Sequence, residues 1–208
     1  LVGSEMCIRD SNSGKICFTL RDDDELIDVK KTNGDNLVLL GSDAGRMVKF
    51  NENEIRVMGR TASGVRGINL EESKCICCEI VNEEDLILLV TEKGYGKQTY
   101  VREFRQTKRG SKGVKALNIT DKNGSLVAVE IIKPDKELVI MTDSGMTMRM
   151  PVDQISVLGR VTQGLRLIHL RDNQKVSAIS LVDKEIESED NNEDTTEVNN
   201  NTESEDTT

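Results

Sequence analysis

The chain has 208 residues, a formal net charge of −9 at pH 7 and 36% hydrophobic residues, enough for the core of one or two ordinary domains. Aromatic residues make up only 2%, so the core must be built from aliphatic side chains and methionine. The sequence contains no long apolar run, and its start lacks the pattern of a signal peptide. We therefore expect neither a membrane span nor a secreted protein.

Cysteine and histidine are too few and too poorly spaced for a metal site. Three of the five cysteines lie at positions 75, 77 and 78 within an apolar run, and the chain has one histidine. A structural metal site would need a second ligand pair at suitable spacing. We interpret the cysteines as reduced side chains that pack as small hydrophobes, which favours a cytoplasmic protein.

The negative charge is concentrated at one end of the chain. Residues 183–208 contain eleven acidic residues and one basic residue, a local charge of −10, with almost no apolar side chains. Such a segment cannot bury enough apolar surface to offset the entropy lost on ordering, so we expect a disordered acidic tail. The remaining 182 residues carry 27 basic and 26 acidic residues, a net charge of +1, so the overall negative charge does not exclude a polyanionic partner for this part.

In chain order, the first segment is 1–12. It matches no other part of the sequence, and we interpret it as a linker or as foreign sequence. Residues 37–40 form a short apolar run that ends at a glycine-containing turn. Residues 46–50 then alternate in character, which predicts a half-buried strand. Apolar runs at 86–90 and 138–141 predict the same strand–turn–strand unit twice more.

Fixed spacings indicate that units of about 50 residues repeat along residues 13–182. The glycines at 45, 94 and 145 are 49 and 51 residues apart, and an Arg-x-x-x-Gly motif recurs at the same two steps. Such units, with about four strands each, are typical of blades around an axis. We predict an all-β fold of propeller-like blades, about three complete and part of another. The motif glycines should occupy turns with positive φ or close backbone approach: Gly64, Gly113 and Gly164.

Basic residues recur in register with these units, and residues 93–115 alone hold eight of them against one acid. Equivalent positions on successive blades should form a curved cationic track, which suits the phosphate backbone of duplex DNA. The scarcity of aromatic residues argues against base stacking on single strands. We predict that the following residues bind the DNA backbone: Arg60, Arg66, Lys97, Arg102, Arg105, Lys108, Arg109, Lys112, Lys115, Arg149, Arg160 and Arg166.

Three stretches of the repeats are characteristic: residues 60–68, Gly94-Tyr95-Gly96-Lys97 and residues 159–166. They resemble motifs of a known family, the C-terminal domain of the bacterial DNA gyrase A protein. The resemblance covers residue 14 to about residue 182 and implies a β-pinwheel that wraps DNA around its rim. For the parent protein it implies a cytoplasmic type IIA topoisomerase that supercoils DNA negatively with ATP and Mg²⁺. Such an enzyme is an A2B2 heterotetramer, and its ATPase lies in the gyrase B protein.

The segment departs from the whole family protein in ways that limit its expected function. The catalytic tyrosine region and the ATPase are absent, so we expect no catalysis, cofactor or metal here. Residues 106–113 resemble the family's gyrase box but match a later blade. Two alternatives stay open, a propeller-like protein-interaction scaffold and the equivalent domain of the topoisomerase IV A protein. We also expect the acidic tail to compete with DNA phosphates for the same cations.

Overall fold

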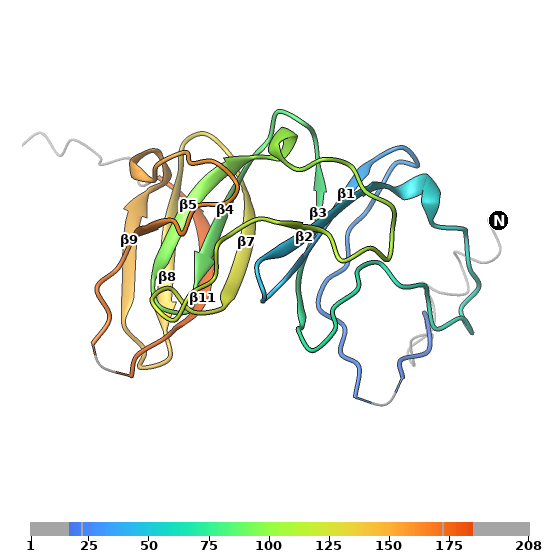
Figure 1. The fold of residues 1–208 in the computed structure, drawn as a ribbon, viewed down its shortest axis with the longest axis horizontal. Helices are drawn as coiled ribbons and strands as arrows, with labels where there is room; N and C mark the ends of the chain where they lie inside the picture. The colour runs from blue at the N-terminus through green and yellow to red at the C-terminus, as the bar shows by residue number, and fades with distance from the viewer. Residues whose placement is uncertain (1–16, 22, 172, 185–208) are drawn as a thin grey trace, which may run out of the picture.

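A computed structural model describes residues 17–21, 23–171 and 173–184, so residues 1–12 and the acidic tail from 185 onward lie outside the described part. The described residues are almost entirely β-strands and loops (Figure 1). Their strands are β1 (Leu37–Ser42), β2 (Arg46–Asn51), β3 (Cys75–Val81), β4 (Leu86–Thr91), β5 (Tyr95–Tyr100), β6 (Val114–Lys115), β7 (Leu126–Ile132), β8 (Lys136–Thr142), β9 (Thr147–Pro151), β10 (Leu165–Arg166) and β11 (Val176–Asp183). Short 3₁₀ helices follow β2, β5 and β9: η1 (Glu52–Glu54), η2 (Val101–Glu103) and η3 (Val152–Gln154).

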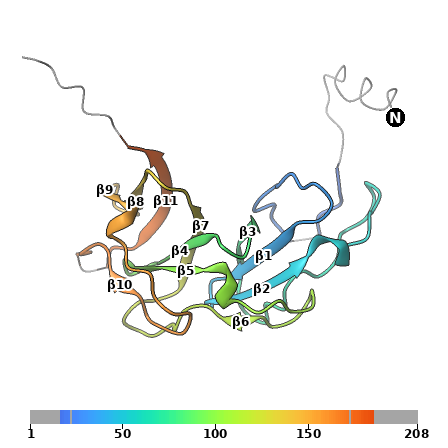
Figure 2. The same cartoon turned by 90° about the horizontal axis from the view of Figure 1, so that it is seen from above.

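The described strands form three antiparallel sheets, which confirms the predicted all-β blades. The strand orders are β3-β1-β2-β6 in the first sheet, β10-β5-β4-β7 in the second and β11-β8-β9 in the third. Figure 2 shows the sheets side by side in an arc, with β3, β7 and β11 on its inner side and β6 and β10 on its outer side. The last strand runs through Asp183, so the predicted boundary of the tail at residue 183 falls inside β11.

Each four-stranded sheet is completed by a strand from the next unit of the chain. After β5 the chain returns to the first sheet, where β6 pairs with β2 in the register Arg46↔Lys115 and Met47↔Val114. After β9 it returns to the second sheet, where β10 pairs with β5. Neighbouring sheets are therefore tied by backbone hydrogen bonds as well as by apolar packing.

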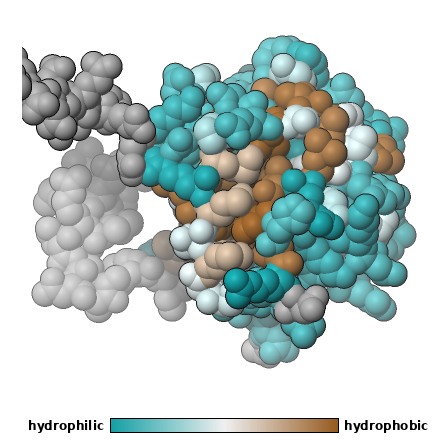
Figure 3. Space-filling model, turned by 90° about the vertical axis from the view of Figure 1, so that its left-hand side faces the viewer, coloured by the Kyte–Doolittle hydropathy of each residue, from teal (hydrophilic) through white to brown (hydrophobic). Residues whose placement is uncertain are grey.

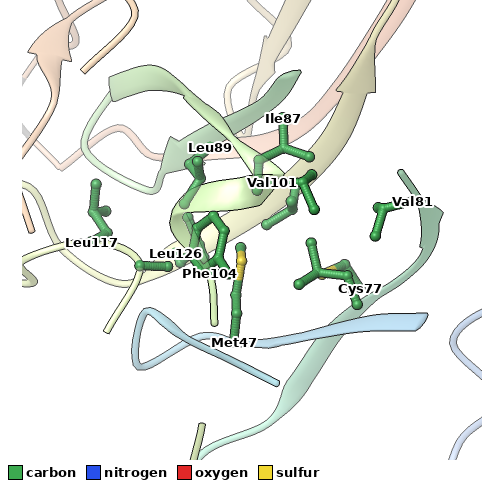
Figure 4. Close-up of a cluster of buried hydrophobic side chains, with 12 residues drawn as sticks. Met47, Cys77, Val81, Ile87, Leu89, Val101, Phe104, Leu117 and Leu126 are labelled. Atoms are coloured by element: carbon green, nitrogen blue, oxygen red, sulfur yellow. The ribbon is translucent and has the colours of Figure 1, made fainter. Parts of the chain in front are cut away.

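The core lies between the sheets, because side chains alternate along each strand and the central strands are covered on both faces. On β4, Ile87 and Leu89 pack toward the first sheet, whereas Leu88 and Val90 pack toward the third. Figure 4 shows the first of these clusters, in which the aliphatic side chains surround Phe104 and Met47. The aliphatic core predicted from composition is confirmed.

The cysteines of β3 behave as predicted for packing residues. Cys77 is buried in the cluster between the first and second sheets, and the described cysteines are free thiols. Burial raises the pKa of the Cys77 thiol far above its ordinary range and that of Cys78 to about 11. Both therefore stay protonated and unreactive near neutral pH.

Two motif glycines allow the returning strands to lie against the sheet they complete. Gly113 has a φ of +71°, and a Cβ there would lie 2.3 Å from the carbonyl oxygen of Met47. Gly164 has a φ of +78°, and its Cβ would lie 2.8 Å from the carbonyl oxygen of Gly96. The prediction of positive φ and close approach is confirmed at these positions.

The end of the arc that carries β9 has exposed apolar surface. Figure 3 looks onto this end and shows apolar surface within hydrophilic surroundings. In the described residues no strand pairs with the outer side of β9. The exposed apolar side chains of the third unit are Met141, Met146, Val157, Val161 and Leu165.

Candidate nucleic-acid interface

Lys115 and Arg166 mark equivalent places on the outer strands of two successive sheets. Lys115 lies on β6 opposite Arg46, and Arg166 lies on β10 opposite Tyr95. Both cations are exposed. Side chains that face each other across an antiparallel pair are close together, and two like charges there are unfavourable unless an anion binds. The Arg46–Lys115 pair thus concentrates positive charge at the outer edge of the arc.

The guanidinium of Arg166 is held in a fixed orientation. Its Nη2 donates a hydrogen bond to the hydroxyl of Tyr95 at 2.9 Å, and its Cζ lies 5.3 Å from the centre of the Tyr95 ring. Its Nη1 lies 3.3 Å from Nδ1 of His169. A planar fork held this way is well suited to an oxyanion, because little side-chain entropy remains to be lost on binding.

The twelve predicted DNA-binding residues fall into four groups in the structure. Six of them combine an exposed side chain with the absence of any carboxylate ion pair within the described part of the chain. These side chains are available to an external phosphate. They are Arg60, Arg66, Arg105, Lys108, Lys115 and Arg166.

Three more predicted residues are exposed but already pair with a carboxylate. Arg102 pairs with Glu84 and stacks on Tyr100, with its Cζ 4.0 Å from the ring centre. The other two pairs are Lys112 with Glu71 and Arg149 with Glu137. Exposed ion pairs contribute little to stability, so these cations can exchange partners at small cost.

The recurrent arginines of the Arg-x-x-x-Gly motif hold neighbouring units together. Arg109 Nη1 donates to the backbone carbonyl of Arg66 at 2.7 Å, and Arg160 Nη1 donates to that of Lys115 at 2.6 Å. Both arginines are half-buried, and Nε of Arg109 is buried without a hydrogen-bond partner in the described residues. The guanidinium groups thus tie each unit to the one before it, a role that sequence reasoning did not assign.

Lys97 must be removed from the predicted interface, because its side chain is completely buried. Its Nζ donates to the carbonyl oxygens of Gly159 at 2.8 Å and Arg160 at 2.7 Å, and to Oγ1 of Thr162 at 3.2 Å. Burial, with a smaller contribution from the nearby Arg160 charge, lowers the pKa of Lys97 to about 8. This lysine anchors the next unit's loop and cannot reach a phosphate on the surface.

The basic segment 93–115 does not form one surface. It passes from a turn through the buried strand β5 and then crosses to the first sheet. The part that resembles a gyrase box, 106–113, lies along the preceding unit. Thr107 N donates to Lys49 O at 2.7 Å, and Gly110 N donates to Gly67 O at 2.6 Å. Local charge in the sequence therefore overstates the charge on any one face.

Several cations near the outer edge were missed because they do not recur. Arg46 is replaced by Tyr95 one unit later, and Lys122 lies in a turn whose counterpart carries Glu72. The signal that could have found them is position rather than recurrence. Arg46 directly follows the turn glycine Gly45, and Lys122 directly precedes the Asn-Gly turn.

Sequence comparison identifies the family to which these sheets correspond. A family model described as the DNA gyrase C-terminal domain, a β-propeller, matches residues 8–33, 36–74, 85–133 and 136–183. The chain belongs to this family. It is 40% identical over 186 residues to the DNA gyrase A protein of Staphylococcus aureus strain NCTC 8325, and 39% identical over 191 residues to that of strain MRSA252. These matches cover 88% and 90% of the chain but only 21% and 22% of the relatives, so the chain spans about a fifth of their length.

Solved structures of the gyrase C-terminal domain and of a relative share this fold. A DNA gyrase A C-terminal domain matches 83% of the chain and 59% of its own length, with a TM-score of 0.73 and 26% identity. A C-terminal domain of DNA topoisomerase IV matches 80% of the chain and 53% of its own length, with a TM-score of 0.75 and 24% identity. The second similarity concerns the fold alone.

The described residues contain no helix that is long and apolar enough to cross a membrane. Within the same residues, no group of three or more histidine, cysteine, aspartate or glutamate side chains could hold a metal ion.

Proposed function

We propose that this chain binds the backbone of duplex DNA along the outer edge of the arc and bends the duplex around it. The observation that carries the proposal is the recurrence of an exposed cation at the same place on two successive outer strands, Lys115 on β6 and Arg166 on β10. Neither has a carboxylate partner in the described residues. Cations presented to solvent in this way attract a polyanion.

The geometry favours a curved duplex over a straight one. Because the outer strands of successive sheets lie on the convex side of the arc (Figure 2), a polyanion that contacts both must follow its curvature. Bending a duplex costs free energy, which the additional phosphate contacts offset. Contacts of this kind position the duplex without reading its bases, so we expect little sequence preference.

The family and the relatives support a place for this activity in a larger protein. We infer that the parent is a gyrase A protein, part of a cytoplasmic type II topoisomerase that supercoils DNA negatively together with the ATP- and Mg²⁺-dependent gyrase B protein. In this proposal the described segment supplies DNA wrapping, and the catalytic groups lie elsewhere. The 40% identity to a gyrase A protein supports this assignment over topoisomerase IV, for which the likeness is one of fold.

A titration of the 208-residue chain against two duplexes of equal length and unrelated sequence tests the proposal. Fluorescence anisotropy at several salt concentrations should give matching affinities for both duplexes. The logarithm of the binding constant should fall linearly with the logarithm of the salt concentration, by about 0.9 per phosphate neutralised. Strong preference for one duplex, or affinity that does not depend on salt, would exclude binding through the backbone.

A further inference from the structure

Two surface hollows lie at corresponding places beside the first two hairpins, yet their charges are opposite. One, of about 400 Å³, lies beside Tyr95 at the start of β5, and we call it the Tyr95 pocket. The other, of about 660 Å³, lies beside Arg46 at the start of β2, and we call it the Asp43 pocket. Tyr95 and Arg46 are 49 residues apart, which is one repeat.

The Tyr95 pocket is lined by cations from three parts of the chain, and its described lining residues include no acid. One of the cations, Lys175, pairs with Glu92 at 2.9 Å, just outside the lining. In the described part of the chain Lys122, Arg166 and Arg171 form no ion pair with a carboxylate. The lining cations are Lys93, Lys122, Arg166, Arg171 and Lys175.

Two of these cations converge on one aromatic ring. Arg166 lies 5.3 Å and Lys122 lies 5.8 Å from the centre of the Tyr95 ring. The ring attracts each of them, but it does not cancel the repulsion between them. An anion placed between Lys122 and Arg166 would relieve that repulsion and accept hydrogen bonds from a guanidinium that Tyr95 already orients.

The Asp43 pocket has more acidic than basic side chains in its lining. Its lining includes Asp43, Glu71 and Glu72, set against Arg46 and Lys112. Lys112 forms an ion pair with Glu71, and this hydrogen bond lowers the pKa of the Glu71 carboxyl below its ordinary value. A phosphate that entered this pocket would meet two or more carboxylates at close range.

One turn position distinguishes the two pockets. Ser73 N donates to Leu70 O in the first unit, and Asn123 N donates to Thr120 O in the second, so Glu72 and Lys122 each directly precede the donor residue of their turn. This correspondence sets Glu72 against Lys122. A single change at this position therefore reverses a charge in either pocket.

We propose that the Tyr95 pocket binds a backbone phosphate of the bound duplex, and that the Asp43 pocket binds no phosphate. The inference rests on the proposed function and sharpens it, because it places the strongest phosphate contact at the junction of the second and third sheets. Arg166 belongs both to the outer strand β10 and to the pocket, so the outer edge leads directly into it.

Charge reversal at matched positions tests this inference in the whole chain. Lys122→Glu should weaken duplex binding by about tenfold beyond a control reversal, as expected for a lost charge-assisted contact. It should also reduce the salt slope by about 1. The control is Lys133→Glu, an exposed lysine after the inner strand β7, which changes the net charge equally. Glu72→Lys, which gives the Asp43 pocket the missing cation, should tighten binding.

The outcomes separate this inference from the proposed function. One outcome is that the unsubstituted chain binds duplex with the expected salt slope while Lys122→Glu and Lys133→Glu weaken duplex binding equally. In that case the Tyr95 pocket does not bind a phosphate, and only this inference fails. A second arm adds inorganic phosphate at constant ionic strength and follows tyrosine fluorescence. If free phosphate perturbs the fluorescence while the two variants bind duplex alike, the pocket takes a free anion and the assignment to DNA is overturned.

Discussion

Two sets of recurrent cations look alike in the sequence but have different roles in the structure. One set lies at the junctions between units, and the other lies at the outer edge of the arc. Arg109 and Arg160 recur 51 residues apart, as do Lys115 and Arg166. The first pair is half-buried and donates to backbone carbonyls of the preceding unit. The second pair is exposed on outer strands.

The difference shows that recurrence in a repeat protein reports any interaction that every unit must make. Packing one unit against the next is such an interaction, and binding a ligand that runs along the array is another. A cation can serve either, because backbone carbonyls and phosphates are both hydrogen-bond acceptors for a guanidinium. Burial and partner atoms separate the two roles, and these come only from the structure.

The largest expected effect lies at a junction glycine. Gly113→Val should lower the free energy of unfolding by about 3 kcal/mol or more, because valine would be strained at positive φ and its Cβ would overlap the fixed carbonyl of Met47. Gly64 also has positive φ, but a Cβ there would meet nothing within 4 Å. Gly64→Val should therefore cost about 1–2 kcal/mol.

Urea unfolding followed by circular dichroism measures both variants. Equal losses at Gly113 and Gly64 would show that backbone conformation alone matters. The close approach of the returning strand would then have no energetic weight of its own.

The next effect concerns the junction arginine. Arg109→Ala should lower the free energy of unfolding by about 2 kcal/mol, because it leaves the Arg66 carbonyl without its charged donor. Lys115→Ala should change stability by less than about 0.5 kcal/mol, as expected for an exposed side chain. If the two variants are equally stable in urea, the assignment of Arg109 to packing is wrong.

These comparisons also show how far the sequence determines the fold and the interface. The 49- and 51-residue spacings, the alternating strands and the motif glycines predict the blades correctly, because they reflect local backbone requirements. The pairing of β6 with the sheet before it could not be predicted, because Val114–Lys115 is too short to show a pattern. For the same reason, nothing local marks Lys97 as buried, since the loop that covers it comes from more than 60 residues later.

A gradual effect, smaller per pH unit than the losses above, depends on pH and on the junction lysine. Lys97 has a pKa of about 8 in the folded chain against an ordinary value of 10.5, so between these values the unfolded chain binds more protons. Stability contributed by this site therefore rises as the pH increases from 8 to 10.5, by at most about 1.4 kcal/mol per pH unit.

The measurement is the difference in unfolding free energy between the parent and Lys97→Met across this range. The difference is needed because the raised pKa values of the Cys77 and Cys78 thiols act in the opposite direction at high pH. Those thiols are common to both chains and cancel. A difference that stays constant from pH 8 to 10.5 would show that Lys97 keeps its ordinary pKa in the folded chain, so that burial does not disfavour its charged form.

The salt dependence of duplex binding tests the central claim most directly. Lys115→Ala with Arg166→Ala should reduce the log–log salt slope by about 2, because each side chain neutralises one phosphate at the outer edge. The matched control is Lys31→Ala with Lys133→Ala, two exposed lysines. Lys31 follows Lys30, which contacts Glu79 of the inner strand β3, and Lys133 follows the inner strand β7. The control should keep the slope of the parent. Equal slopes in the parent and both double variants would show that DNA does not follow the outer edge of this arc.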